Sequence, residues 1–356
     1  MGIKGLKPLL KSFGIYEYTV PLTKMTGKTL AVDGTFMLHK YKNCHSAPWH
    51  YLVLYMLVSL KLRNVNAIFV FDGQPLPEKS REKMCRKSRK QAMVDKGELL
   101  KAQFREWETS KVAAPELEAT VQRLSKTKCI EPTLDNKETA TTVETYIGNL
   151  AKDTRVTGQD YQLFRQSLEA FGFPYMDAPD EAELCCVRMT EMGLVDGPLT
   201  IDSDAIACGA YHNVDTVYTD IYGDNLKAIS VRHSTEALGL NGREFLDLCV
   251  MCGTDFNMRI HKLGPATALK LIKTFGSIEN LPSNIQTECL AAVRTREILI
   301  GRDMEDRRKE IETLQNGPVS GEKIKQTFSS EMLNKLIQDN AHIRANLRLV
   351  APGIFA

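Results

Sequence analysis

The fold is decided by the stretch Ala67-Ile68-Phe69-Val70-Phe71-Asp72-Gly73. Its apolar run has no polar alternation and ends at an aspartate followed by a glycine turn. Such a run is typical of a strand buried on both faces, as in a parallel sheet that helices cover. Two further runs have the same form, since Thr29-Leu30-Ala31-Val32 leads into Asp33 and Leu199-Thr200-Ile201 leads into Asp202.

A helical pattern over 49–62 separates the first two of these runs. It is long enough to serve as the crossover between two parallel strands. The predicted fold class is therefore α/β, with a central, mostly parallel sheet flanked by helices. In open sheets of this kind, functional sites form beyond the carboxyl ends of the strands, which is where the aspartates stand.

The composition is that of an ordinary globular protein, with 356 residues, 43% hydrophobic and 25% charged. No apolar run reaches the length of a membrane span. Among nine cysteines, the one CxxC is Cys249 and Cys252, inside an apolar run. Reduced core thiols are favoured there over a metal or redox site. This cysteine usage predicts a reducing intracellular location, with no secretion.

Basic residues are concentrated between Leu76 and Lys90, although the net charge of the chain is only +2. In this stretch two glutamates accompany seven basic residues, namely Lys79, Arg81, Lys83, Arg86, Lys87, Arg89 and Lys90. The concentration indicates an enzyme that handles a polyanion, and the alternative is a solvated helix face. A helix is expected from about Glu78 to Glu108, followed by a polar, irregular segment over 110–157.

Acidic residues recur at the predicted ends of strands and helices: Asp33, Asp72, Glu181, Glu183, Asp202, Asp204 and Asp255. A single aspartate after a strand is usually a helix cap or a turn former. Several acids that converge on one sheet edge repel one another and need a compensating cation. Oxygen ligands without a histidine or cysteine cluster favour Mg²⁺, with Mn²⁺ as the alternative, over zinc. Two such ions could serve phosphodiester hydrolysis.

Several motifs in order resemble the structure-specific 5′ nucleases, a superfamily of flap endonucleases, XPG-type excision nucleases and the 5′-to-3′ mismatch-repair exonuclease. The resemblance covers about residues 1–105 and 161–275. The motifs are Met1-Gly2-Ile3-Lys4-Gly5-Leu6, Val32-Asp33, Phe69-Val70-Phe71-Asp72-Gly73, Asp177-Ala178-Pro179-Asp180-Glu181-Ala182-Glu183, Ile201-Asp202-Ser203-Asp204 and Gly253-Thr254-Asp255-Phe256. The resemblance implies a PIN-like nuclease core with a helical arch and a helix–hairpin–helix region.

The domain organisation expected from this resemblance has five parts. They are an N-terminal nuclease region with a basic arch helix (1–108), an insertion or flexible arch segment (109–158), an internal nuclease region (159–240), a helix–hairpin–helix DNA-binding region (241–280) and a C-terminal helical extension (281–356). The extension contains helical patterns but no recognisable chemistry.

The resemblance also implies roles for individual residues. The seven acids would hold two Mg²⁺ ions, and Lys79 and Arg86, seven apart on one helical face, would steady the scissile phosphate. Gly2 would lie near the active site, where a side chain would obstruct. Further DNA contacts are expected from Arg89 and Lys90.

Residues 260–265 resemble the family's helix–hairpin–helix, in which a K⁺ ion helps to bind a backbone phosphate. DNA contacts are expected there from His261, Lys262 and Gly264. Lys262 stands where the family usually has glycine, so the sequence is compatible both with a K⁺ ion at this turn and with its absence. His39 falls where the family places a base-stacking aromatic or histidine, and a core histidine is the alternative.

The predicted function is that of a metal-dependent 5′ nuclease acting on flaps, nicks or recessed ends during DNA replication, repair or recombination. The expected partner is branched or nicked double-stranded DNA with a 5′ single strand, and the expected state is a monomer. No sliding-clamp motif is found near the C-terminus. The expected location is the nucleus or another intracellular site of DNA replication. A PIN-type single-strand ribonuclease and a non-catalytic DNA-junction binding protein are the alternatives. The flap and exonuclease branches are not distinguished.

Overall fold

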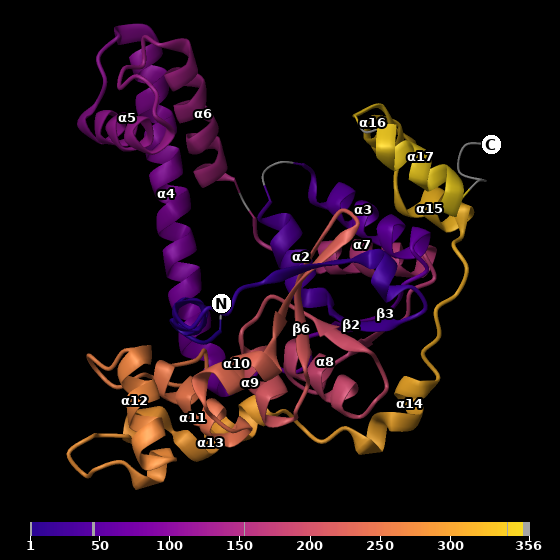
Figure 1. Cartoon of the computed structure of the whole chain (residues 1–356). Coiled ribbons are helices and arrows are strands. Elements are labelled where there is room, and N and C mark those ends of the chain that lie inside the picture. The colour runs from indigo at the N-terminus through magenta and orange to yellow at the C-terminus, as the bar shows by residue number, and fades with distance from the viewer. Residues whose placement is uncertain (1, 45–46, 153, 340, 352–356) are drawn as a thin grey trace. The chain divides into compact units, whose positions relative to one another are not determined.

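The computed structural model describes residues 2–44, 47–152, 154–339 and 341–351 (Figure 1). The chain divides into two compact units. One unit, called the sheet unit below, combines residues 1–79 with 156–356, and the other, called the helical unit, comprises residues 80–155. No described helix is both long and apolar enough to cross a membrane.

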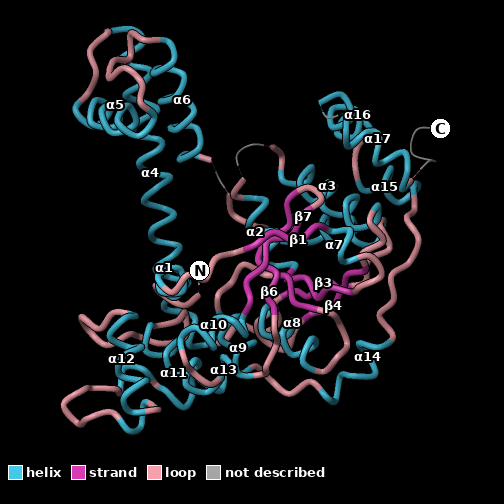
Figure 2. The backbone as a smooth tube through the Cα atoms, viewed as in Figure 1, coloured by secondary structure: helices cyan, strands magenta, loops and turns pink. Residues whose placement is uncertain are grey.

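The sheet unit is built on one seven-stranded sheet, with the order β1-β7-β6-β5-β2-β3-β4. The four pairings among β4, β3, β2, β5 and β6 are parallel, and β7 pairs antiparallel with β6 and with β1. The strands are β1 (Tyr18–Pro21), β2 (Thr29–Asp33), β3 (Asn66–Phe71), β4 (Tyr175–Asp177), β5 (Gly197–Leu199), β6 (Thr216–Tyr222) and β7 (Asn225–Ser230). The prediction of a mostly parallel sheet flanked by helices is confirmed (Figure 2).

Helices account for most of the remaining chain. Those of the sheet unit are α1 (Leu6–Ser12), α2 (Gly34–Lys42), α3 (Trp49–Leu62), α7 (Gly158–Ala170), α8 (Ala182–Glu191), α9 (Asp204–Tyr211), α10 (Val231–Leu238), α11 (Gly242–Cys252), α12 (Pro265–Phe275), α13 (Ala292–Ile300), α14 (Arg308–Glu312), α15 (Gly321–Thr327), α16 (Ser330–Asp339) and α17 (Ala341–Val350). Short 3₁₀ turns are η1 (Leu22–Met25), η2 (Pro77–Lys79), η3 (Ile278–Asn280), η4 (Glu288–Leu290) and η5 (Glu305–Arg307).

The central strands are buried on both faces because their apolar side chains alternate between two cores. Phe69 and Phe71 of β3 pack with the residues of α2, α3 and α7. Ile68 and Val70 face the other way and pack with α8. This arrangement explains why the strand sequence is continuously apolar.

Three local expectations need correction. The strand before Asp202 ends at Leu199, so Thr200 and Ile201 belong to the loop that follows it. The long basic helix begins at Ser80, and Lys79 lies in the 3₁₀ turn η2 before it. Lys79 and Arg86 are therefore not on one face of one helix, because the backbone geometry changes between them.

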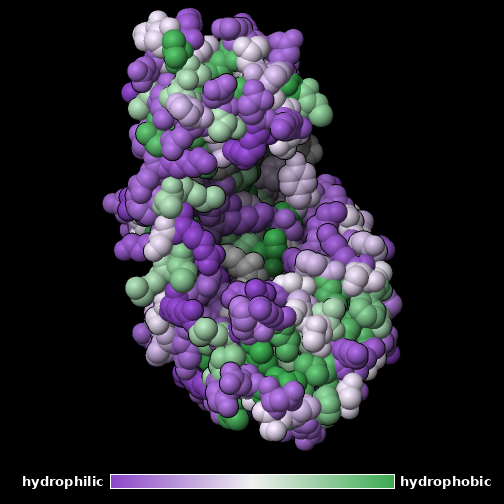
Figure 3. Space-filling model, turned by 90° about the vertical axis from the view of Figure 1, so that its left-hand side faces the viewer, coloured by the Kyte–Doolittle hydropathy of each residue, from purple (hydrophilic) through white to green (hydrophobic). Residues whose placement is uncertain are grey.

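The helical unit contains α4 (Ser80–Ser110), α5 (Pro115–Lys128) and α6 (Lys137–Ala151), so the expectation that 110–157 is irregular is wrong. The three helices share a core of Leu100, Phe104, Trp107, Leu117, Val121, Leu124, Leu134, Val143 and Ile147. Its surface is mostly hydrophilic where Figure 3 shows it, at the top of the view. Most of the charged residues that made the segment look irregular are exposed, while the apolar residues of the core follow helical spacing.

A buried ion cluster holds α13 in the sheet unit. The Arg296 guanidinium donates to both carboxylate oxygens of Asp247 on α11, at 2.5 and 2.8 Å, and to both of Glu279, at 2.5 and 3.0 Å. Asp247 is fully buried, and it also accepts from the backbone nitrogen of Ile278 at 3.1 Å. Breaking such a cluster leaves an uncompensated charge in the protein interior.

We therefore expect Arg296→Ala to destabilise the sheet unit by about 3–5 kcal/mol, because the buried Asp247 carboxylate would lose its ion-pair partner. The two tryptophans lie in different units, so Trp49 fluorescence in a Trp107→Phe background would report urea unfolding of the sheet unit alone. Arg232→Ala is the control, since its pair with Glu236 is largely exposed and its loss should change nothing measurable. Equal effects of the two variants would contradict the prediction.

Candidate metal centre

Asp33 and Asp72 stand at the carboxyl ends of two neighbouring parallel strands, β2 and β3. Asp33 is buried and caps α2, where its Oδ1 accepts from the backbone nitrogen of Phe36 at 2.7 Å. Its Oδ2 accepts from Thr200 Oγ1 at 2.9 Å. The backbone nitrogen of Asp72 donates to Thr35 Oγ1 at 2.8 Å. Capping and strand pairing together therefore set the position of both aspartates.

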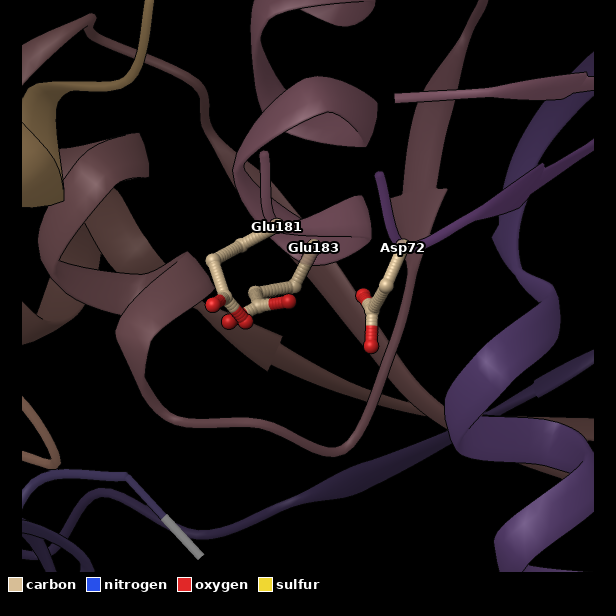
Figure 4. A group of neighbouring side chains, drawn as sticks. All are labelled: Asp72, Glu181 and Glu183. Atoms are coloured by element: carbon tan, nitrogen blue, oxygen red, sulfur yellow. The ribbon is translucent and has the colours of Figure 1, made fainter. Parts of the chain in front are cut away.

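Glu181 and Glu183 come from the start of α8. Glu181 is the N-cap residue, Glu183 lies in the first turn, and both are buried. Asp72 Oδ1 accepts from the backbone nitrogen of Ala182 at 3.0 Å, which joins the end of β3 to this helix. The partial positive charge of a helix start stabilises carboxylates there. Figure 4 shows the three carboxylates gathered at this end of α8.

Asp202 and Asp204 follow β5 and are also buried. The backbone nitrogen of Asp204 donates to Asp202 Oδ1 at 3.2 Å, and that of Asp202 donates to Thr200 Oγ1 at 3.2 Å. Asp204 opens α9, so its carboxylate also lies at a helix start.

Five of the seven predicted acids form two groups in the described part of the chain, each with one carboxylate oxygen per residue within 4.8 Å of the others. The groups are Asp72, Glu181 and Glu183, and Glu183, Asp202 and Asp204. Glu183 belongs to both groups and links them. Asp33 and Asp255 are in neither group, but both are buried. Their charges add to the effect of burial on the groups: that of Asp33 helps to raise the pKa of Glu183, and that of Asp255 helps to raise the pKa of Asp204.

The site concentrates negative charge away from water. Burial, followed by the charge of Asp202, raises the pKa values of Glu183 and Asp204 far above the usual carboxyl range. Burial and the charge of Asp72 raise the pKa of Asp33 to about 8. Glu183 Oε1 and Asp204 Oδ1 are buried without a hydrogen-bond partner. Buried oxygens of this kind fit a divalent cation, and an oxygen-only ligand set suits Mg²⁺ or Mn²⁺.

Lys79 is the positive side chain at this site. Its ammonium forms an ion pair with Glu181 and lies 5.6 Å from the centre of the Phe256 ring. Burial alone would lower the pKa of Lys79, but the charges of Glu183 and Glu181 raise it above its ordinary value. Lys79 is therefore a permanent cation beside the carboxylates.

Residues 2–4 pass beside the second carboxylate group. The backbone nitrogen of Ile3 donates to Ser203 Oγ at 2.8 Å, and that of Lys4 donates to the Gly253 carbonyl at 2.9 Å. A Cβ on Gly2 would lie 2.1 Å from Asp202 Oδ1 and 2.8 Å from Asp204 Oδ1. Gly2 also has a φ of +79°, which side chains disfavour. Glycine is thus required by space and by backbone conformation.

The segment after α11 carries Asp255 and leads to the predicted hairpin. Asn257 accepts from the backbone nitrogen of Thr254 at 2.8 Å and donates to the carbonyls of Val250 and Leu290, which stabilises the loop around Asp255. Lys262 is exposed and adopts a φ of +60°, in the left-handed region that favours glycine. His261 is also exposed, and Gly264 caps α12.

Of the other predicted DNA contacts, His39 belongs to the sheet unit, and Arg86, Arg89 and Lys90 belong to the helical unit. His39 is half-buried on α2, and its carbonyl accepts from the backbone nitrogen of Asn43 at 3.1 Å. Arg86 and Arg89 belong to the helical unit and pair with Glu82 at 3.4 and 3.6 Å. Lys90 is on the same helix, α4.

Sequence reasoning missed the hydroxyl groups that orient the acids. Thr200 donates to Asp33 and accepts from Asp202, Thr35 accepts from Asp72, and Ser203 accepts from Ile3. Their positions in the sequence could have indicated them, because each hydroxyl-bearing residue stands within two positions of a predicted metal ligand. Neutral hydroxyls give no charge pattern of their own.

Comparison with known proteins identifies the family to which the chain belongs. The XPG N-terminal domain model matches residues 1–93 and the XPG I-region model matches 172–255. The putative RAD2-like endonuclease 095R of Frog virus 3 (isolate Goorha) is 60% identical over 357 residues, covering 100% of this chain and 98% of the relative. Flap endonuclease 1 of Meyerozyma guilliermondii is 26% identical, covering 79% of this chain and 73% of the relative.

Solved structures show the same fold. Flap endonuclease-1 from Methanococcus jannaschii matches with a TM-score of 0.57 and 15% identity, covering 96% of this chain and 97% of that one. The catalytic core of Rad2 in complex with DNA substrate also matches with a TM-score of 0.57 and 15% identity, covering 94% of this chain and 99% of that one. The chain is therefore a nuclease-fold protein of the XPG class. It belongs to the RAD2-like endonuclease family.

The raised pKa of Asp33 predicts how the stability of the metal-free protein depends on pH. Because its folded-state pKa of about 8 exceeds the ordinary value of about 3.9, the folded protein holds a proton that the unfolded chain releases. In the presence of a chelator, the stability of the folded protein should therefore fall as the pH rises from about 4 to about 8. Asp33→Asn keeps the cap on Phe36 and should be more stable than the natural protein at pH 8, by on the order of a few kcal/mol.

Thermal unfolding followed by circular dichroism at both pH values checks this prediction. The advantage of the Asp33→Asn variant should disappear at pH 4, and the natural protein should gain stability from added Mg²⁺ or Mn²⁺. Asp303→Asn is the control, since that side chain is 80% exposed. An advantage of the same size at both pH values would contradict the prediction.

Proposed function

We propose that this protein is a Mg²⁺-dependent 5′ nuclease that hydrolyses DNA phosphodiesters, with flap endonuclease and 5′-to-3′ exonuclease activities. The observation that carries the proposal is the pair of carboxylate groups that share Glu183, with the Lys79 ammonium beside them. The putative endonuclease relative at 60% identity over the whole chain supports the same assignment.

In this proposal the carboxylates bind the cations, and Lys79 binds the substrate phosphate. Asp72, Glu181 and Glu183 would hold one divalent ion, and Glu183, Asp202 and Asp204 a second, with Asp33 and Asp255 contributing charge from just outside. Such ions, when bound, supply an activated water and stabilise the leaving oxygen. Lys79 would hold the scissile phosphate and offset the negative charge that shifts during the displacement. Gly2 leaves room beside Asp202 for the substrate.

Duplex DNA is the proposed partner, held next to the site by the turn before α12. Lys262 is exposed there, and its positive φ supports a hairpin turn that has no glycine at this position. The Lys262 ammonium would contact a backbone phosphate, with His261 and Gly264 beside it. A K⁺ ion at this turn remains part of the proposal. The related Rad2 core was solved with a DNA substrate, which supports the choice of partner.

We propose that the helical unit and α2 determine whether the protein prefers flaps, nicks or recessed 5′ ends as substrates. Neither family model covers residues 94–171, which include α5 and α6. Arg86, Arg89 and Lys90 of α4 would contact the 5′ strand, and His39 of α2 would stack on a base. The nine free cysteines suit an intracellular place of action, the nucleus or another site of DNA replication.

The proposal predicts Mg²⁺-dependent cleavage of a 5′-flap or nicked duplex. Asp204→Asn should lower the rate by ~100-fold or more, because a ligand to the cation loses its charge. The measurement compares both proteins on flap, nick, gap and recessed-end duplexes, with Mg²⁺ and with chelator. Equal cleavage by both proteins would reject the assignment. Activity that requires single-stranded RNA would support a ribonuclease instead, and tight junction binding without turnover a non-catalytic binding protein.

The hairpin part of the proposal has a separate test. Lys262→Gly keeps the left-handed backbone and removes the ammonium, so the fold should be unaffected. Duplex affinity should weaken, and the slope of log affinity against log salt should decrease by about 1. Fluorescence anisotropy with Ca²⁺ at several salt concentrations measures both. Lys309→Gly, exposed on α14, is the control, and an unchanged slope for Lys262→Gly would exclude the phosphate contact.

A further inference from the structure

Glu78, the residue before Lys79, makes an ion pair with the C-terminal region. Its Oε1 accepts from Arg294 Nε at 2.7 Å, and Arg294 is on α13. Both residues belong to the sheet unit, like the carboxylate groups. The pair joins the turn η2 to a region in which no sequence pattern indicated any chemistry.

This ion pair is more restrained than one between freely exposed side chains. The Arg294 side chain is half exposed, but the Glu78 side chain is only 26% exposed, and its second oxygen, Oε2, is buried without a hydrogen-bond partner. Arg294 is oriented by a further contact, from Nη1 to Glu297 Oε2 at 3.3 Å. The hydrogen bond from Arg294 lowers the pKa of Glu78, so the glutamate stays charged at neutral pH.

Contacts with the protein interior fix the position of helix α13, which carries Arg294. Arg296, two residues further on, is held by its buried pair with Asp247 and by a second pair with the half-exposed Glu279. Thr295 Oγ1 donates to the Leu290 carbonyl at 2.9 Å, and Leu299 is fully buried in the core. The position of the Arg294 backbone is therefore set by the interior of the protein.

The turn η2 is thus held from two sides. The Glu78 side chain reaches α13, while the Lys79 ammonium reaches Glu181 and the Phe256 ring. A lysine has a long, flexible stem, so the position of its ammonium depends on how firmly its backbone is held. Displacements on the order of 1 Å are enough to impair a catalytic group.

We propose that Arg294 is a positioning residue, which through Glu78 holds η2 so that the Lys79 ammonium stays among the carboxylates. The inference rests on the proposed function of Lys79 at the scissile phosphate. It assigns Arg294 no contact with DNA. Removing the pair should therefore slow the reaction without changing duplex affinity.

Single-turnover cleavage of a 5′-flap duplex with Mg²⁺ tests the proposal. Arg294→Ala should lower the rate roughly fivefold, the factor expected for losing one restrained ion pair, with DNA affinity in Ca²⁺ unchanged. In a Lys79→Met background the same change should have no further effect, because the group that it positions is absent. Exchanging the charges, with Glu78→Arg and Arg294→Glu together, should restore the rate. Arg308→Ala is the control, since it removes the ion pair between Arg308 of α14 and Glu305 of η5.

Two outcomes would overturn the proposal. One is an equal loss of rate in the Lys79→Met background, which would make Arg294 independent of Lys79. The other is weaker duplex binding with a smaller salt slope, which would make Arg294 a DNA contact.

A second readout does not depend on cleavage. Lys79 should react slowly with an amine-directed acylating reagent, because its side chain is only 13% exposed and ion-paired. Mass spectrometry should find this labelling accelerated severalfold by Arg294→Ala, with Lys309 unchanged. If the natural protein cleaves no DNA, the proposed function fails while the labelling still decides whether Arg294 holds Lys79. Unchanged labelling would reject the positioning role.

Discussion

Mutual repulsion among buried carboxylates is the constraint on which the structure of the sheet unit depends. Glu183 and Asp204 are in the interior, each with an oxygen that has no hydrogen-bond partner, and the charge of Asp202 opposes the charge of both. An arrangement of this kind lowers the stability of the fold unless a cation is present. The surrounding structure must therefore hold the acids in place against their own repulsion.

The fold meets this requirement with backbone geometry and not with salt bridges alone. Parallel strands bring Asp33 and Asp72 to one edge of the sheet. Helix starts carry Glu181 and Asp204, where the helix dipole favours negative charge. The cores on the two faces of the sheet, formed with α3 and α8, make the strand ends rigid.

The sequence was informative where a pattern is local. A continuous apolar run that ends in aspartate predicts both a buried strand and a site residue at its end, so the sheet edge and the acids could be found. The helical unit was misread because polar residues outnumber the apolar ones in it, although Leu117, Val121 and Leu124 have helical spacing. The contact of Arg294 with Glu78 joins residues that are 216 positions apart, and no local pattern encodes such a contact.

The backbone contacts of residues 3 and 4 have a consequence for synthesis of the chain. The backbone nitrogen of Ile3 donates to Ser203 and that of Lys4 to Gly253, so residues 3 and 4 find their partners only after about two hundred later residues have been synthesised. Helix α8, β5 and α11 must also emerge before all the acids can meet. An unfinished chain therefore lacks the complete set of carboxylates, which can assemble only after Asp255 on the segment following α11 has been made.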